Sequence, residues 1–210
     1  MLVPLLLLAT IHWDIANLPN ANVDYWVERF SKGDKRDEIA LYLSRKPEYE
    51  AMIEGKLSER KMPADLIYLA MVESGFNPQA HSAQDARGIW QLSADTARRY
   101  KLHVDDDVDE RLDAEKSTDA ALEFLSDLHA KFGSWYLAAA AYNAGEGRLA
   151  QIMNDSIGSI WGEDADYYRI RELLPAETRD FVPAMIAAAR IGKDPARYGF
   201  SDQARFAGPE

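Results

Sequence analysis

A single glutamate at the end of a short apolar helix is the residue of this sequence best placed for acid–base chemistry. The stretch from Pro63 to Gly75 predicts that helix, because proline suits a first helical position and glycine suits the left-handed residue after the last. Glu73 shares one helical face with three apolar residues, Leu66, Leu69 and Ala70. Its carboxylate is therefore predicted to point towards the interior.

Two features of that position are expected to keep the carboxyl of Glu73 protonated. Burial disfavours the charged form, and the last turn of a helix adds the partial negative charge of its free carbonyls. Both raise the pKa of a carboxylic acid, and an acid that holds its proton near neutral pH can serve as a general acid. The ordinary alternative is a glutamate whose stem packs at a helix end while its carboxylate reaches water.

The composition allows one sizeable core and excludes several kinds of site. The chain has 210 residues, 47% of them hydrophobic, which suits one domain with an N-terminal extension. A net charge of -11 argues against a nucleic-acid partner or an anionic membrane surface. The chain has no cysteine and its four histidines lack metal-site spacing, so we expect no metal and no cofactor.

The first residues form an apolar run with two open interpretations. Residues 2–9 are interrupted by Pro4 and are too few to span a membrane as a helix. A secretory signal peptide starts with basic residues, whereas the first basic residue here is Arg29. The run is either the remnant of a signal peptide or an apolar segment that packs on the domain.

Helical periodicity along most of the chain predicts a mainly α fold. Helices are expected over residues 23–30, 34–60 (as two helices separated near Pro47), 63–74, 93–100, 113–132, 134–142, 148–153, 167–174 and 184–191, the last capped by Gly192. Residues 12–22, 105–110 and 156–166 are predicted to be loops, and the acidic run 105–110 lacks the glycine and terminal glutamate of a calcium loop. A short strand over residues 88–92 is the one departure from the helical pattern.

Four short motifs then stand in order along the chain: Glu73-Ser74, Gly88-Ile89-Trp90-Gln91, Ala141-Tyr142-Asn143-Ala144-Gly145 and Glu177-Thr178-Arg179. In that order they resemble the catalytic domain of the lytic murein transglycosylases of glycoside hydrolase family 23, which look like goose-type lysozyme in fold. Residues 72–78, 109–113, 116–118, 174–179 and 197–199 look like the membrane-bound lytic murein transglycosylase D group. The resemblance covers about residues 17–200.

The resemblance implies a mainly α, lysozyme-like domain with a substrate groove. Residues 61–200 would form the catalytic domain, residues 1–60 an N-terminal extension with helices packed on it, and residues 201–210 a tail. The partner would be the glycan strands of peptidoglycan, and the protein would be a monomer in the periplasm or cell envelope. No metal, cofactor or nucleic acid is implied.

The resemblance also implies a reaction. Glu73 would protonate the oxygen between N-acetylmuramic acid and N-acetylglucosamine, then act as base on the sugar's own C6 hydroxyl and close a 1,6-anhydro ring. Glycosidases that use a nucleophile or water need a second carboxylate at about 5–5.5 or 6.5–9.5 Å. An intramolecular hydroxyl gains effective concentration without that partner. If a second carboxylate is used, Asp85 is the nearest candidate in the sequence.

Further residues are implied to line the groove. Ser74 follows the acid, Ser82 and Gln91 would bind N-acetyl groups, and Gly88 would let the backbone approach the substrate closely. For Ser82 the sequence alone favours an ordinary loop cap, and for Gly88 a plain turn is an equal alternative.

The third motif is implied to contribute an aromatic contact. Tyr142 would lie against the glycan, with Asn143 fixing it by side-chain hydrogen bonds, and the alternative is simply the end of a buried helix. Trp90 is expected in the core rather than on the glycan.

Three positions depart from the family pattern, and they leave rival functions open. Asp85 stands where glycine is usual and should change the loop geometry, and Ser93 replaces a methionine. Phe181 replaces a tyrosine whose hydroxyl would bond the catalytic carboxyl, so Glu73 should lie in a drier site with a higher pKa. The alternatives are a goose-type muramidase that uses water and a catalytically weak glycan-binding or scaffold domain.

Overall fold

Helices account for the regular structure of residues 11–200, which are the residues that the computed structural model describes. The prediction of a mainly α fold is confirmed. The predicted strand at residues 88–92 is wrong, because the bridges from Arg87 to His81 and to Leu92 are isolated and form no strand in the described range. The predictions for the apolar run 2–9 and for the tail 201–210 fall outside the described residues.

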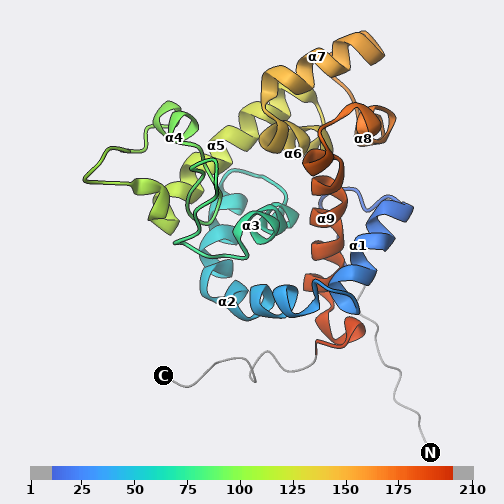
Figure 1. The fold of residues 1–210 in the computed structure, drawn as a ribbon, viewed down its shortest axis with the longest axis horizontal. Helices are drawn as coiled ribbons and strands as arrows, with labels where there is room; N and C mark the ends of the chain where they lie inside the picture. The colour runs from blue at the N-terminus through green and yellow to red at the C-terminus, as the bar shows by residue number, and fades with distance from the viewer. Residues whose placement is uncertain (1–10, 201–210) are drawn as a thin grey trace, which may run out of the picture.

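The helix that ends near Glu73 lies at the centre of the molecule. A 3-10 turn, Ala64–Leu66, leads into α3, Ile67–Ser74, and Gly75 ends it with a φ of 58° as predicted. Residues 65–71 are all buried. Figure 1 shows α3 enclosed by four longer helices, α2 (Arg36–Glu59), α5 (Ala114–Phe132), α6 (Trp135–Ala144) and α9 (Ala176–Lys193).

Several helix starts follow the capping chemistry of the sequence. The Ser93 hydroxyl accepts a hydrogen bond from the backbone N–H of Thr96 at the start of α4, Ala94–Arg99. Asp113 and Ser134 cap α5 and α6 in the same way. Helix α7 (Glu146–Ile157) is longer than predicted, and α8 (Asp164–Ile170) begins three residues earlier than predicted and is followed by a 3-10 turn, Arg171–Leu173. The loop expected over residues 156–166 is therefore shorter.

The prediction that the last helix begins after Pro183 is wrong, because α9 runs through that proline. A proline inside a helix leaves the carbonyl four residues earlier without its usual donor. Here that carbonyl belongs to Arg179, and it accepts hydrogen bonds from the Tyr167 hydroxyl and from Nε of Arg171, each at 2.8 Å. Gly192 likewise lies within α9 rather than capping it.

The prediction of two helices separated near Pro47 is also wrong, since α2 is continuous. Buried residues lie on both sides of the proline, Ile39 and Leu43 before it and Ile53 and Leu57 after it. Packing of both halves against the core keeps them in one helix. Figure 1 shows that α2 changes direction along its length, as proline-containing helices do.

The N-terminal segments pack directly on the centre of the molecule. Helix α1, Ala21–Ser31, lies along α9, and α2 contacts α3 and α5. Before α1, the backbone N–H groups of Asp14 and Ile15 donate to the Asp65 carboxylate at 2.9 and 3.1 Å. The domain boundary at residue 60 remains a prediction. No helix between residues 11 and 200 has the length and apolar character needed to cross a bilayer.

Candidate active site

The carboxyl group of Glu73 opens into a cleft of about 360 Å³ between the N-terminal helices and α9. From α3 and α6 the lining residues are Val72, Glu73 and Asn143. Helix α9 adds Glu177, Asp180, Phe181 and Ala184. Residues 26–42 supply the opposite wall, with Trp26, Phe30, Lys35, Glu38, Ile39 and Tyr42.

The surroundings of Glu73 favour its protonated form. Burial raises the pKa of this carboxyl to about 8, and the negative charge of Glu177 adds to the shift. The residue is partly exposed and lines the cleft. The predicted direction of the pKa and its main cause, burial, are confirmed. The contribution of the helix end stays a prediction.

Among residues 11–200, no side chain or backbone group forms a hydrogen bond that would lower the pKa of the Glu73 carboxyl. Phe181 is 8% exposed and lines the same cleft, at the position where the resembling family has tyrosine. An apolar ring there offers no donor, which agrees with the expectation of a drier site.

Asn143 joins α6 to α9 instead of fixing Tyr142. Its Nδ2 donates to Glu177 at 3.3 Å, and its Oδ1 accepts from the Thr178 hydroxyl at 2.7 Å. The predicted hydrogen bond from Asn143 to Tyr142 is therefore wrong, because consecutive helical residues do not face each other. Asn143 holds Glu177 at the cleft that contains Glu73.

Tyr142 is placed near Glu73 by two fixed contacts. Its hydroxyl donates to the Trp90 carbonyl at 2.7 Å, and its ring lies 5.1 Å from the ring of Phe124. Burial and the charge of Glu73 raise its pKa well above the ordinary tyrosine value. Trp90 is fully buried, as predicted, and its Nε1 donates to Thr118 at 2.8 Å.

Three predicted groove residues make internal contacts around the loop that follows α3. The Ser74 hydroxyl donates to the Ile89 carbonyl at 2.7 Å, and Nε2 of Gln91 donates to the Gly88 carbonyl at 2.9 Å. Gly88 has a φ of 78°, and a Cβ there would lie 1.9 Å from the carbonyl oxygen of Arg111. Glycine is therefore required here because the backbone of Gly88 packs closely against the backbone of Arg111. Direct contact of these residues with glycan remains a prediction.

The loop that carries Ser82 and Asp85 is held by its own hydrogen bonds and ion pairs. The Ser82 hydroxyl accepts from the backbone N–H of Ala86 at 3.0 Å, as a loop cap does. Asp85 has a φ of 60°, in the left-handed region that glycine adopts readily. The expected change in loop geometry stays a prediction. Its carboxylate pairs with Arg87 and Arg111 at 2.9 and 3.3 Å.

The second carboxylate beside Glu73 is Glu177 rather than Asp85. The guanidinium of Arg87 holds the pKa of Asp85 below its usual value, and Asp85 lies outside the residues that line the cleft. Sequence reasoning placed Glu177 in a motif without giving it a role. It also missed the α1 and α2 residues of the cleft, whose apolar spacing looks like that of any core-facing helix.

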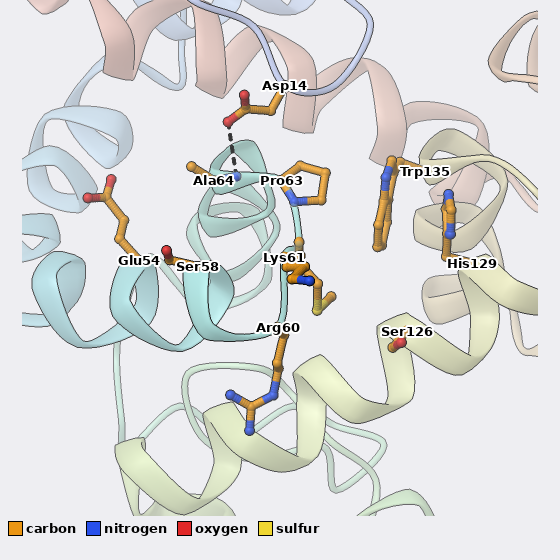
Figure 2. Close-up of a pocket in the computed structure, with 11 residues that line it drawn as sticks. Asp14, Glu54, Ser58, Arg60, Lys61, Pro63, Ala64, Ser126, His129 and Trp135 are labelled. Carbon is orange, nitrogen blue, oxygen red and sulfur yellow. Dashed lines mark hydrogen bonds between the residues drawn. The ribbon is translucent and has the colours of Figure 1, made fainter.

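A larger cavity of about 710 Å³ lies at the other end of the central segment, beside Ala64. Figure 2 shows Trp135 and His129 on one side of it and Glu54 on the other, with Asp14 accepting a hydrogen bond from the Ala64 N–H at 3.1 Å. All of the predicted site residues are in the described range, and none of them lines this cavity. The smaller cleft is therefore the candidate active site.

Comparison with known proteins identifies the family. Residues 50–157 match the model of the transglycosylase SLT domain. Membrane-bound lytic murein transglycosylase D of Escherichia coli strain K12 is 40% identical over 152 residues, which are 72% of this chain and 33% of that protein. A putative tributyltin chloride resistance protein of Alteromonas sp. strain M-1 is 37% identical over 113 residues, 53% of this chain and 55% of that one.

A solved structure agrees with the fold. The 70 kDa soluble lytic transglycosylase SLT70 of Escherichia coli superposes with a TM-score of 0.60 at 23% identity, covering 87% of this chain and 29% of that one. The chain thus spans about a third to a half of the length of these proteins. Since the family model covers residues 50–157 of 210, just over half of the chain, the protein belongs to the transglycosylase SLT domain family.

Proposed function

We propose that this protein is a peptidoglycan lytic transglycosylase with Glu73 as its acid and base. The observation that carries the proposal is a carboxyl group in a cleft whose pKa burial raises to about 8. At neutral pH such a group holds a proton that it can donate. The membership of the family and the names of the relatives, lytic murein transglycosylases among them, support the same reaction.

In the first step Glu73 donates its proton to the oxygen that links N-acetylmuramic acid to N-acetylglucosamine. The bond from C1 to that oxygen breaks, N-acetylglucosamine leaves with the proton, and positive charge develops at C1. Glu73 is left as a carboxylate beside that charge. Burial of the carboxyl strengthens this electrostatic interaction, because the surrounding protein screens it less than water would.

In the second step the Glu73 carboxylate removes the proton of the C6 hydroxyl on the same sugar. The C6 oxygen bonds to C1 and closes the 1,6-anhydro ring, which returns Glu73 to its protonated form. Water is not consumed. The reaction needs a sugar held with its C6 hydroxyl towards Glu73, and the fixed ring of Tyr142 is proposed to hold it.

Glu177 is proposed to keep Glu73 protonated between turnovers. Its negative charge opposes ionisation of Glu73, and its own position is set by the amide of Asn143. Of the predicted glycan contacts, Ser82 and Gln91 lie on the loop of residues 80–91 that follows α3. We propose that this loop binds the N-acetyl groups.

The proposed partner is the glycan strand of peptidoglycan, and the proposed location is the periplasm or cell envelope. The relative from Escherichia coli strain K12 is described as membrane-bound and as acting on murein, which supports both points. The proposed active form is a monomer.

Mass analysis of the products tests the proposal. Purified sacculi are digested with wild-type protein and with Glu73→Gln, and the released muropeptides are weighed. Anhydro ends, each lighter than a reducing end by one water, are expected from the wild type and nothing from the variant. Release of nothing by the wild type contradicts an enzymatic role and favours the glycan-binding or scaffold alternative.

One observation favours a second candidate, a muramidase that uses water. Glu177 lies in the same cleft as Glu73, and a second carboxylate is what a hydrolase needs to activate water. Reducing ends among the wild-type products would assign this function instead. Glu177→Gln separates the two roles, since it removes a hydrolytic base but leaves the transglycosylation acid in place.

A further inference from the structure

Helix α1 carries three aromatic residues, Tyr25, Trp26 and Phe30, which we call the aromatic wall. The rings of Trp26 and Phe30 lie 5.2 Å apart and both line the cleft that contains Glu73. Tyr25 meets Trp26 edge to face at 5.8 Å. Phe30 is 5% exposed and Tyr25 is 55% exposed, so the wall leads from the buried part of the cleft to the surface.

A separate ion pair holds this wall in place. The guanidinium of Arg29 lies 4.8 Å from the ring of Trp26 and 5.7 Å from that of Tyr25. Arg29 is itself fixed by Asp34, which accepts from Nε at 2.9 Å. Stacking of a cation on two rings limits their motion, so the rings present a preformed surface.

Trp26 also carries an unused hydrogen-bond donor. Its Nε1 is buried and has no acceptor among residues 11–200. Buried tryptophan N–H groups usually have a partner, because leaving one unpaired is costly. Since the same side chain lines the cleft, a ligand hydroxyl or carbonyl that enters with a small shift of the ring can supply the acceptor.

The cleft alone is small for a polymer. Its volume of about 360 Å³ is near the lower end of the range of about 300–1,000 Å³ in which proteins hold small molecules. A glycan strand must therefore continue beyond it over neighbouring surface. Aromatic rings that also offer a donor suit a sugar, which has an apolar face of C–H groups and a rim of hydroxyls.

We propose that the aromatic wall of Tyr25, Trp26 and Phe30 binds a sugar ring of the glycan strand next to the pair joined by the bond that is cut. This inference rests on the proposed function, because it takes peptidoglycan glycan as the ligand. The wall lies outside residues 50–157, so it is a feature of this chain beyond the matched family segment. Its contacts are remote from the reacting bond, and they hold the strand while Glu73 acts.

Binding to a protein that cannot cut tests the wall directly. Glu73→Gln is titrated calorimetrically with an octasaccharide of alternating N-acetylglucosamine and N-acetylmuramic acid, alone and combined with Tyr25→Ala or Trp26→Phe. We expect Tyr25→Ala to weaken binding about tenfold, which corresponds to about 1.4 kcal/mol. Trp26→Phe keeps a ring but removes the donor, and we expect a loss of about threefold.

Leu41→Ala is the matched control. Leu41 is also an exposed apolar residue, 46% exposed, and it lies on α2 outside the cleft. Its replacement is expected to leave the affinity unchanged. The inference is overturned if Tyr25→Ala stays within twofold of its parent, if Leu41→Ala weakens binding equally, or if the parent binds no octasaccharide.

The two proposals fail in different ways. If wild-type protein releases no muropeptides while Tyr25→Ala still weakens octasaccharide binding, the proposed reaction fails and the wall remains a glycan site. If muropeptides are released but the affinity does not depend on Tyr25 or Trp26, the wall fails and the reaction stands.

Discussion

The central segment carries a carboxylate at each end, and their surroundings are opposite. Asp65 is 2% exposed, and its Oδ2 accepts two backbone N–H groups while its Oδ1 faces the ammonium group of Lys193. Glu73, eight positions later, meets the negative charge of Glu177 and lines a cleft. The same chemical group is matched by donors in one place and left without them in the other.

The difference separates a structural from a chemical role. Asp65 joins the segment before α1, the start of the central helix and the end of α9 through Lys193. Both of its oxygens take part in these contacts, Oδ2 through hydrogen bonds and Oδ1 through the ion pair. Glu73 forms no such contacts between segments, so its proton remains available for transfer. The cleft gives a substrate access to this proton. Substitutions at the two residues should therefore have opposite consequences.

The largest expected effect is on activity at Glu73. Glu73→Gln keeps the shape and the polarity of the side chain but removes the transferable proton, so the rate should fall about 100- to 10,000-fold. Release of muropeptides from sacculi measures it. Asp65→Asn serves as the contrast, with activity per folded molecule expected within twofold of wild type. Equal losses of activity at both residues would contradict the division of roles.

The next effect is on stability at Asp65. Asp65→Asn leaves the ammonium group of Lys193 without its carboxylate, and breaking a buried ion pair costs about 3–5 kcal/mol. We expect the free energy of unfolding in urea to fall by about 3 kcal/mol, since Lys193 is partly accessible. Glu73→Gln should show no such loss at neutral pH. A stable Asp65→Asn would show that water replaces the missing charge.

A smaller effect is the pH dependence of stability that Glu73 introduces. Folding raises its pKa from 4.5 to about 8, so the folded protein binds the proton more tightly than the unfolded chain. The stabilisation is complete below pH 4.5 and is lost as the pH rises to 8. By calorimetry, the Tm of Glu73→Gln should equal that of the wild type at pH 4 and lie a few degrees above it at pH 9. A constant difference in Tm would contradict the raised pKa.

Capping residues and motifs in the sequence were enough to predict the central helix and its acid. Gly75 ends α3 as expected, and the inward position of the Glu73 carboxyl follows from the apolar residues on its helical face. These features are local, because they depend on residues three or four positions apart. The starts of α5 and α6 follow likewise from the capping residues Asp113 and Ser134.

Contacts between distant segments could not be predicted in this way. Pro183 is compatible with an uninterrupted α9 because Tyr167 and Arg171 donate hydrogen bonds to the Arg179 carbonyl. The sequence pattern around the proline does not predict those donors. Glu177 comes near Glu73 because α9 packs on α3, although the two residues are 104 positions apart. Trp26 and Phe30 of α1 have ordinary helical spacing, and only the fold turns them towards the cleft.

The smallest expected effect comes from giving Glu73 one of the donors that Asp65 already has. Phe181 lines the cleft, and Phe181→Tyr adds a hydroxyl at the edge of its ring. If that hydroxyl donates to the carboxylate, it favours the charged form and lowers the pKa of Glu73 from about 8. The alkaline limb of the pH–rate profile should then move to lower pH. A better oriented carboxyl should raise the rate near pH 6 about threefold.

Phe181→Leu separates the hydroxyl from the change of shape. It alters the packing of the cleft but adds no donor, so the alkaline limb should stay where the wild type has it, near pH 8. A shift in Phe181→Tyr alone assigns the effect to a hydrogen bond on Glu73. If both variants leave the limb unchanged, position 181 does not reach the carboxyl. In that case burial and the charge of Glu177 alone keep Glu73 protonated. A single added donor on α9 does not then give Glu73 the hydrogen-bonded surroundings of Asp65.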